Sequence, residues 1–600
     1  METRDPHSFH IPVMGIGYTI DAPVKVAQYG ISSAISLVDD MLMEKLREFY
    51  SRKLDIPFKA ISNLMDDHRA KRITAYLDLV EEIVKEKFET VVNSVLESGE
   101  EIEKYMDMLP DLSTLKQKFN QFINKGMLKS ELYIWIRKNL SIGSIDVNIM
   151  TKLDKDNYNK NEKLPVVYND AHAALRGFAK SKLQSSIILS AGMNPRLYSY
   201  LENFEDFFPA ESGELRKKII LKVSDFRSAL IQGKFLAKKG LWISEYRIES
   251  GLNCGGHAFA TEGYLMGPIL EQFRNEREAL IQATHELYVD ALRAKNRPCP
   301  ESPMSVRITA QGGVGTTEEH QFLLDYYLLD SVGWGSPFLL VPEATNVDEK
   351  TMDLLSGAGE DDLYLSNISP LGIPFNTLKG NTKDIEKQER INRGRPGSYC
   401  PKKYAAFNKE LSEKGDCTAS RKYQMQKIRT LNDNKLRAED YKKEFEKIVE
   451  KSCICVGLGT SSLLVNHLDT KIEGGGVSIC PGPNMASFSK VVSLREMTGH
   501  IYGKNNILTD KDRQHMFVKE LAMYIDFLKA RIEEAPLPMD EKQVKYFTDF
   551  RNHLKEGIHY YKRLFSGSGK FKKIIDDLML LENGLERIVL GDHIGEEIKA

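Results

Sequence analysis

Residues 308–319 have the sequence Ile-Thr-Ala-Gln-Gly-Gly-Val-Gly-Thr-Thr-Glu-Glu, and this stretch decides the fold class. Its apolar run ends in two glycines, which predicts a buried strand followed by a tight turn. Thr316 and Glu319 then have the spacing of a capping box, which predicts the start of a helix. A strand that leads directly into a helix is the repeating unit of a parallel sheet. The backbone N–H groups of such a turn can also bind an anion such as phosphate.

Similar units recur through the first 345 residues. Short apolar runs flanked by Gly, Ser and Asp predict buried parallel strands, and most of these runs are followed by a helical pattern. The runs cover residues 11–18, 34–38, 186–193, 218–224, 241–246, 305–310 and 331–341. Residues suited to function follow the C-terminal ends of many of the runs. This placement favours a closed (β/α)8 TIM barrel over a doubly wound sheet.

A chain of 600 residues is too long for one hydrophobic core, so we expect two or three domains. Residues 1–40 and 150–365 are predicted to form the barrel. Residues 41–149 are rich in Glu, Lys, Leu and Met at helical spacing, which predicts a helical insertion after the second strand. Residues 366–490 form a cysteine-bearing, loop-rich region that we expect to cover the mouth of the barrel. Residues 491–600 predict a largely helical C-terminal region.

The composition limits the function classes. The chain is 42% hydrophobic and 28% charged, with a net charge of −2, which argues against binding to nucleic acid or to a membrane surface. The start of the chain lacks the pattern of a signal peptide, and no apolar run approaches the roughly 20 residues that span a bilayer. Seven cysteines form no disulfide framework, so we expect a cytoplasmic protein. The expected partner is a small-molecule substrate, and a homo-oligomer is left open.

The strongest chemical motif is Ser250-Gly-Leu-Asn-Cys-Gly-Gly-His257, which follows the predicted strand 241–246. Gly255 and Gly256 let the backbone approach a flat ligand where a Cβ atom would collide. Imidazole takes up a proton near neutral pH, so His257 is the candidate general base. The alternative is a tight turn with a hydrogen-bonded structural histidine.

A second glycine-rich motif, Asp330-Ser-Val-Gly-Trp-Gly-Ser-Pro-Phe338, lies one predicted helix downstream of the 308–319 stretch. The last two strands of a barrel often supply the two halves of a phosphate site. Ordinary turns between strand and helix are the alternative. The candidate cofactor-binding residues of the two motifs are Gln311, Gly312, Gly313, Gly333, Gly335 and Ser336.

The order of these motifs resembles that of the nitronate monooxygenase (2-nitropropane dioxygenase-like) flavoproteins. The shared features are a Pro-Val-Met-Gly strand at residues 12–15, the Gly-Gly-His after a central strand, the Gly-Gly-Val turn and the final Gly-x-Gly-Ser-Pro-Phe. Members of this family are FMN-binding TIM barrels, related to the enoyl reductases of fatty-acid and polyketide synthesis. The resemblance covers about residues 11–40 and 185–345, and it implies FMN as the cofactor.

The resemblance also implies roles for individual residues. It puts His257 where the family has its catalytic base, and it puts Gly312 and Gly313, with Gly335 and Ser336, around the FMN phosphate. Met14 and Gly15 would lie against the isoalloxazine ring. Lys222, at the end of the predicted strand 218–224, could stabilise negative charge on the reduced flavin.

The activity implied by the resemblance is that of an FMN-dependent oxidoreductase of the nitronate monooxygenase type. In such an enzyme His257 would remove an acidic proton next to a nitro or carbonyl group, and FMN would accept the electrons. The nearest alternative is an enoyl reductase, which runs the flavin in the other direction on an enoyl thioester. The chain has Asn253-Cys254 where the family has Glu-Ala. This difference argues against a nitronate as the substrate but leaves the barrel and the flavin as implied. A further alternative is a barrel without flavin that serves as an interaction scaffold through its helical insertion.

Five of the seven cysteines fall in one stretch of the chain, namely Cys400, Cys417, Cys453, Cys455 and Cys480. Thiolates bind soft metals, and a Cys-Pro pair occurs in bacterial iron–sulfur sequences. The spacing contains no C-x-x-C pair, however, and C-x-C is a poor chelating loop. Two interpretations therefore stay open: an iron–sulfur or other metal site beside the flavin, and buried structural thiols, which the spacing favours.

Overall fold

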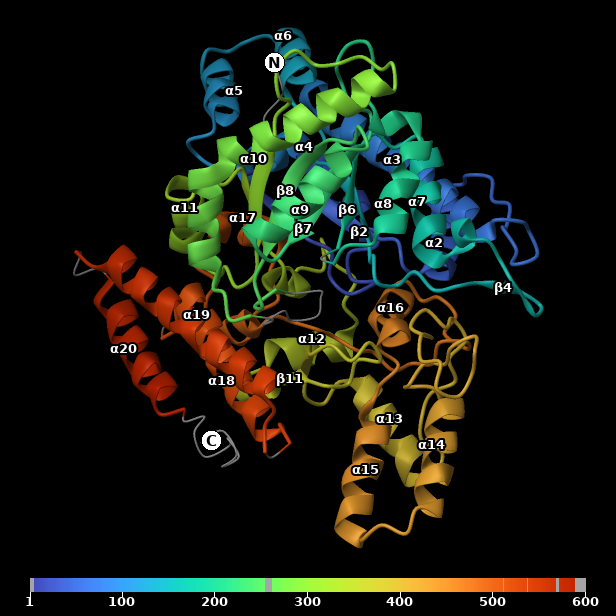
Figure 1. Ribbon diagram of the computed structural model, residues 1–600. Coiled ribbons are helices and arrows are strands. Elements are labelled where there is room, and N and C mark those ends of the chain that lie inside the picture. The colour runs from blue at the N-terminus through green and yellow to red at the C-terminus, as the bar shows by residue number, and fades with distance from the viewer. Residues whose placement is uncertain are drawn as a thin grey trace.

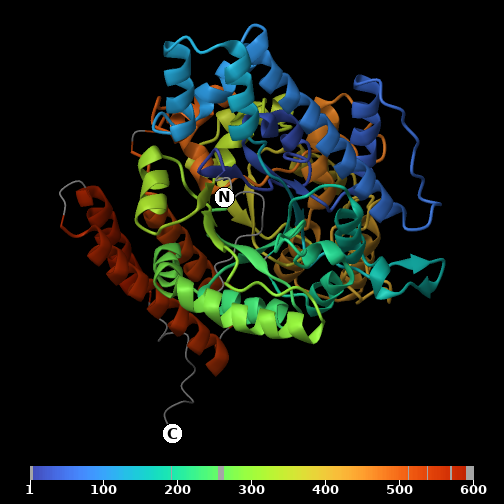
Figure 2. The ribbon, with the colours of Figure 1, turned by 90° about the horizontal axis from the view of Figure 1, so that it is seen from above.

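The computed structural model describes residues 5–190, 192–253, 262–510, 512–536, 538–567 and 571–588. Eight strands of the described chain close into a barrel in which each strand is parallel to both neighbours (Figure 2). In order around the barrel they are β1 Phe9–Ile11, β10 Ser331–Gly333, β9 Arg307–Gln311, β8 Ile243–Glu249, β7 Lys218–Val223, β6 Ser186–Leu189, β3 Ile145–Ile149 and β2 Ser32–Ser36. The predicted (β/α)8 barrel is confirmed.

One barrel strand was not predicted from the sequence. Strand β3 has the sequence Ile-Asp-Val-Asn-Ile and lies inside the range 41–149 that was assigned to the helical insertion. Its polar residues Asp146 and Asn148 are buried. Because its polar and apolar residues alternate, this strand contains no continuous apolar run that would predict it, and the barrel resumes at Ile145 rather than at residue 150.

Two predicted strands have different bounds in the structure. The first strand is at Phe9–Ile11 instead of residues 11–18, and the last ends at Gly333 instead of residue 341. The apolar residues after it belong to the short 3-10 helix η6, Ser336–Leu340, which Pro337 helps to begin. Apolar sequence that is buried in a loop therefore accounts for both errors.

The interior of the barrel has an apolar wall and a polar wall. Residues paired across parallel strands point to the same face, and the pairs Ile220↔Glu245 and Ile188↔Ile220 put these three side chains inside. The apolar wall is a small cluster separate from the main core, formed by Val13, Ala34, Ile188 and Ile220. The polar wall, on the neighbouring strands β8, β9 and β10, carries Glu245, Arg247, Glu249, Thr309, Gln311 and Ser331.

Five helices occupy the chain between β2 and β3, as predicted for the insertion. They are α2 Asp40–Lys53, α3 His68–Asn93, α4 Glu100–Met108, α5 Thr114–Asn124 and α6 Lys129–Asn139. Helix α3 buries Ile73, Leu77, Val80 and Val84 along one face, the spacing of an amphipathic helix. It packs between α2 and α7.

The other helices that follow barrel strands are α1 Ala22–Val26, α7 Asp170–Lys180, α8 Pro195–Tyr200, α9 Phe226–Ala237, α10 Met266–Ala294, α11 Thr317–Asp325 and α12 Glu349–Ser356. Of these, α7, α8, α9, α10 and α11 lie around the strands, whereas α12 lies near β11, Leu363–Ser366 (Figures 1 and 2). The C-terminal ends of the strands lead into the loops that meet α16 and the C-terminal helices.

The region 366–490, predicted to be loop-rich, contains four helices in addition to a short hairpin. Its elements are β11 Leu363–Ser366, β12 Phe375–Leu378, α13 Thr382–Asn392, α14 Arg421–Asp433, α15 Ala438–Glu450 and α16 Ile454–Val465. Helix α16, which was not predicted, is rich in glycine and serine, but most of it is buried, and tertiary packing overrides its weak helix propensity. Helices α14 and α15 extend away from the barrel, whereas α16 lies next to it (Figure 1).

The C-terminal region is helical, with α17 Leu494–Ile501, α18 Met516–Glu533, α19 Glu541–Phe565 and α20 Lys572–Glu586. Helices α18, α19 and α20 pack on one another, and α19 also packs on α10. In the described part of the chain no single helix has the length and apolar character of a membrane span. Only α15 and α16 together meet these criteria, and they are bent by 45°.

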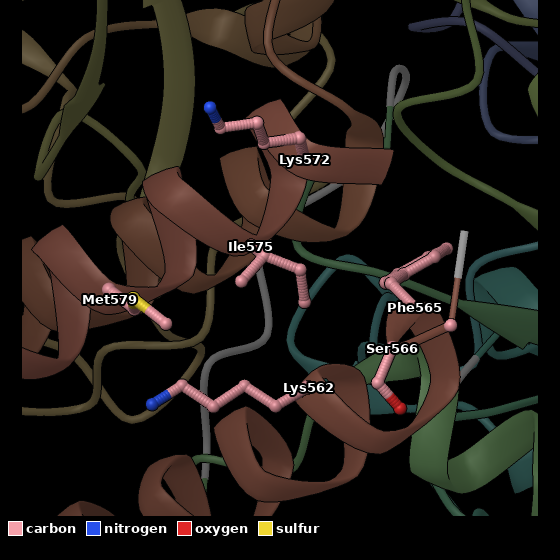
Figure 3. Close-up of a pocket in the computed structure, with 7 residues that line it drawn as sticks. Lys562, Phe565, Ser566, Lys572, Ile575 and Met579 are labelled. Atoms are coloured by element: carbon pink, nitrogen blue, oxygen red, sulfur yellow. The ribbon is translucent and has the colours of Figure 1, made fainter. Parts of the chain in front are cut away.

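A cavity of about 530 Å³ lies between the end of α19 and the start of α20 (Figure 3). It is lined by Lys562, Phe565, Ser566, Gly567, Lys572, Ile575 and Met579. These residues belong to the outer helices of the C-terminal region, and none lies on a barrel strand. The cavity is therefore separate from the predicted site.

Candidate functional site

Three donors converge on one carboxylate oxygen at the C-terminal ends of β7, β8 and β9. Glu249 Oε1 forms an ion pair with Lys222 Nζ at 2.8 Å, and it accepts hydrogen bonds from Gln311 Nε2 at 2.8 Å and Asn253 Nδ2 at 2.7 Å. The side chains of Lys222 and Glu249 are 8% and 5% exposed. A buried charge is tolerated when it is paired and hydrogen-bonded. Here the positive charge of Lys222 balances the negative charge of Glu249. We call these four residues the mouth cluster.

The mouth cluster contains two predicted residues and two that the prediction missed. Lys222 and Gln311 were predicted, whereas Glu249 and Asn253 were not proposed as site residues. A signal for Glu249 was present, because a carboxylate at the end of an apolar strand needs a partner inside the fold. The pairing of Lys222 with Glu249 also means that the lysine is not an isolated positive charge.

A second polar layer lies deeper in the barrel. Glu245 Oε1 accepts from Arg247 Nε at 2.7 Å and from Thr309 Oγ1 at 2.6 Å. Burial alone would raise the pKa of Glu245, but Arg247 and Arg307 outweigh burial and hold this pKa below its usual value. Burial, reinforced by the same two arginines, holds the pKa of His10 well below its usual value. The floor beneath the mouth cluster therefore has an ionised Glu245 and a neutral His10.

The glycine turn after β9 has the backbone that the sequence predicts. Gly312 and Gly313 have φ angles of 120° and 85°, a region that side chains disfavour. A Cβ atom on Gly313 would lie 2.5 Å from Leu252 Cδ1, and one on Gly312 would lie 3.1 Å from the backbone nitrogen of Asn253. The two glycines therefore allow the loop after β8 to pack directly on the turn after β9.

The start of α11 is held by a carboxylate. Thr316 Oγ1 accepts from the backbone N–H of Glu319 at 3.1 Å, as the predicted capping box requires. The Glu319 side chain, however, accepts from the N–H of Gly315 at 2.9 Å and pairs with Arg513 at 2.7 Å. Because Glu319 occupies the N-terminus of α11, the candidate phosphate contacts are reduced to the Gly312–Gly313 turn and Ser336.

The turn after β10 contacts the region that follows α16. Ser336 Oγ accepts from the backbone N–H of Gly482 at 2.8 Å, which leaves the serine proton to be donated. Asn484 Nδ2 donates to the carbonyl of Val314 at 3.0 Å, beside the glycine turn. Gly333 has a packing role as well, because a Cβ atom there would lie 2.6 Å from Gln311 Cβ.

The predicted ring-contact residues meet helix α16. Met14 is fully buried, and its N–H donates to Thr19 Oγ1 at 3.2 Å. A Cβ atom on Gly15 would lie 3.3 Å from Leu458 Cδ2, and the N–H of Gly17 donates to the carbonyl of Leu458 at 2.8 Å. Helix α16 thus packs on the loop after β1, at the C-terminal end of that strand.

Gly255, Gly256 and the candidate base His257 lie outside the described residues, as does Cys254. The residues on both sides of this segment are held by the C-terminal helices. On α18, Glu520 Oε2 accepts from the N–H of Met266 at 2.9 Å, and Tyr524 Oη accepts from the N–H of Gly251 at 3.2 Å. On α19, Tyr561 Oη accepts from the N–H of Gly267 at 3.0 Å. The sequence carried no signal for these contacts, because they join residues more than 250 positions apart.

Four of the five candidate cysteines, Cys400, Cys417, Cys453 and Cys455, contact one another. The thiol of Cys400 forms hydrogen bonds with those of Cys417 and Cys453, and Cys453 contacts Cys455. As their side chains stand, no group of three or more His, Cys, Asp and Glu in the described chain is arranged to hold a metal ion.

Comparisons with known proteins leave the family open. No protein-family model matches the chain, and no curated protein matches it significantly. The enoyl reductase domain of MlnA from the macrolactin biosynthesis cluster of Bacillus amyloliquefaciens aligns with 67% of this chain and 87% of its own length, at 15% identity and a TM-score of 0.30. FabK from Thermotoga maritima aligns with 67% of this chain and 82% of its own length, at 12% identity and a TM-score of 0.30. Similarities this weak support no conclusion about this chain. The barrel is established by the pairing of its strands.

Proposed function

We propose that the chain is an FMN-dependent oxidoreductase whose flavin binds across the C-terminal mouth of the barrel. The observation that carries the proposal is the mouth cluster, with Lys222, Glu249 and Gln311 on three adjacent strands, next to the Gly312–Gly313 turn. Ligands of barrel enzymes bind at this end, and phosphate sites often lie after the last two strands. An apolar wall facing a polar wall also suits the isoalloxazine ring, which has an apolar and a polar end.

Two buried acceptors fit this cofactor. Asn148 Oδ1, which faces the barrel interior, and Asn484 Oδ1, beside the turns after β9 and β10, have no hydrogen-bond partner among the described residues. Buried acceptors normally have a donor. The imide N–H of a flavin and the hydroxyls of its ribityl chain are donors of the required kind. Ser336 retains a proton for a phosphate oxygen.

Different residues of the chain would then bind the cofactor and move the proton. FMN supplies the electron transfer when it is bound. Gly312, Gly313 and Ser336 would hold its phosphate, and the mouth cluster would hold the polar end of the ring. His257 would remove a proton from a carbon atom next to a nitro or carbonyl group, as in nitronate monooxygenases. The same residues also serve an enoyl reductase, in which the flavin reduces an enoyl thioester.

The test is the absorbance spectrum of the purified full chain, followed by denaturation and mass spectrometry of the released chromophore. We expect a flavin spectrum and stoichiometric FMN. A colourless chain that takes up no FMN on reconstitution would contradict the proposal. If FMN is present, anaerobic mixing with a nitroalkane should bleach the flavin, whereas reoxidation of the reduced flavin by an enoyl thioester would identify the reductase.

Substitution of His257 separates binding from catalysis. His257→Ala should retain FMN and lose at least about 100-fold in turnover, the usual contribution of a general base. His559→Ala is the matched control, because His559 is exposed on α19 and its imidazole bonds only within its own helix, to the carbonyl of Lys555. Equal activity in the two variants would exclude His257 as the base.

A further inference from the structure

The four contacting cysteines come from three short segments, at residues 400, 417 and 453–455. Cys400 and Cys417 lie in the long connection between α13 and α14, and Cys453 and Cys455 lie at the first turn of α16. Three of the four side chains are buried, with exposed fractions of 2–5%, and Cys400 is partly exposed. We call these residues the four-cysteine cluster.

Backbone and amide hydrogen bonds hold the three segments together. The N–H of Ser398 donates to the carbonyl of Ala419 at 3.0 Å, and the N–H of Arg421 donates to the carbonyl of Ser398 at 2.9 Å. Gln424 Nε2 donates to the carbonyls of Thr418 at 3.2 Å and Lys451 at 3.1 Å. These bonds bring the residues next to Cys400, Cys417 and Cys453 to one place, independently of the thiols themselves.

The cluster lies beside a helix N-terminus and two lysines. Cys453 is the N-cap residue of α16, and Lys383 lies near its sulfur. Lys402, whose side chain is 1% exposed, faces Cys455. A helix N-terminus and nearby lysines are the features that activate cysteine thiols.

Four thiols in one buried place are poorly explained as structural side chains. The S–H group is a weak donor and acceptor, so contacts between thiols add little stability. Four thiolates are the complete ligand set of a structural zinc ion and of common iron–sulfur clusters. The four sulfurs interact with one another, but their present positions do not surround a metal ion, so metal binding requires the side chains to reorient.

We propose that Cys400, Cys417, Cys453 and Cys455 bind a soft metal centre through four thiolates, either one Zn²⁺ ion or one iron–sulfur cluster. The proposal does not depend on the proposed flavin chemistry, because the four-cysteine cluster lies in the region 366–490 and shares no residue with the mouth cluster.

The site is joined to the barrel through a buried ion pair and a helix. Lys402 Nζ lies 2.5 Å from Asp39 Oδ2, and Asp39 is the N-cap residue of α2, just after β2. The same helix that begins at the cluster contacts the loop after β1 through Leu458 and Gly17. A metal here would therefore order the part of the chain that packs on the loop after β1.

The test is metal analysis of the full chain, purified without chelator and without oxygen. We expect either stoichiometric zinc without acid-labile sulfide, or iron with acid-labile sulfide and a visible absorbance band. Cys417→Ser and Cys455→Ser should each lose most of the bound metal. Cys299→Ser, at an exposed cysteine outside the cluster, is the matched control and should retain it. Wild-type protein that is folded and holds neither metal would overturn the proposal, as would full retention in both ligand variants.

Thiol alkylation provides a second measurement on the wild-type chain, which avoids variants that fail to fold. The four thiols should be protected in the native protein and become reactive together when a strong chelator removes the metal. Exposed Cys299 should react in both conditions. Alkylation of the four cysteines at equal rates with and without chelator would contradict metal ligation.

Discussion

The mouth cluster and the four-cysteine cluster are both buried and polar, but they differ in how their charges are balanced. In the mouth cluster one carboxylate, Glu249, meets one ammonium group, Lys222, and two amides complete its hydrogen bonds. In the four-cysteine cluster the sulfurs contact one another. The charges of the first set balance without a ligand, and Gln311 Oε1 has no hydrogen-bond partner among the described residues. The second lacks a cation shared by its thiols, and a soft metal would supply that charge.

The two clusters also differ in how the fold positions them. The mouth cluster is built on the ends of adjacent strands, whose spacing is set by the barrel. The four-cysteine cluster is built on a long connection and a helix N-terminus. We therefore expect the mouth cluster to tolerate the loss of a ligand and the four-cysteine cluster to depend on one.

Removal of the metal should give the largest effect. A structural zinc site contributes roughly 10 kcal/mol to the folding of a small module, so chelation should unfold the region that carries the cysteines. Limited proteolysis should then cleave between residues 366 and 490 while the barrel stays intact. The same digestion pattern with and without chelator would contradict the expectation that the four-cysteine cluster depends on a bound metal.

Glu249→Ala should destabilise the barrel strongly, because it leaves the ammonium group of Lys222 buried without a counter-charge. The expected loss is about 3–5 kcal/mol of unfolding free energy, measured by urea denaturation. The double variant Lys222→Met with Glu249→Leu is the control and should recover most of this loss. A cost below about 1 kcal/mol for Glu249→Ala would mean that water reaches the pair.

Glu520, on α18, is buried and has no counter-ion among the described residues. It differs in this from Glu249, which is paired with Lys222. Burial raises its pKa to about 7, against 4.5 for a free glutamate. The folded state therefore holds an extra proton between pH 4.5 and 7, and unfolding free energy falls as pH rises through this window. At pH 8 the penalty is about 3 kcal/mol.

Glu520→Gln should remove this pH dependence and retain an oxygen for the N–H of Met266. The melting temperature of the wild-type chain should fall between pH 5 and pH 8 relative to that of the variant. The comparison isolates the titration, because the two side chains have nearly the same shape. Parallel melting curves across this pH range would show that Glu520 titrates normally.

Local sequence signals were reliable for glycines in tight turns and for the threonine that caps a helix. The Gly312–Gly313 turn and the Thr316 cap have the predicted backbone and hydrogen bond. Strand β3 was missed because its polar residues face the barrel interior, where Asp146 accepts hydrogen bonds from Ser144 and Ser185. Helix α16 was missed because its glycines and serines are stabilised by burial and not by propensity.

The candidate site likewise contains residues that the sequence predicts and contacts that it does not. Lys222 and Gln311 could be proposed from their positions at strand ends, but Glu249 as their common acceptor required the register of three strands. The contacts of Glu319 with Arg513, and of Glu520 with Met266, join segments separated by about 200 residues or more. Pattern and propensity act within a few residues, so they carry no information about such pairs.

By itself, the sequence determined the fold class, the glycine turns at the strand ends and the supply of cysteines in one stretch. Those properties follow from local backbone preference and from the spacing of apolar residues. Only the tertiary structure decided which charges neutralise one another and which four thiols meet. Ion pairs and metal sites depend on distances of a few ångströms between atoms, and closure of the barrel and packing of α16 set those distances.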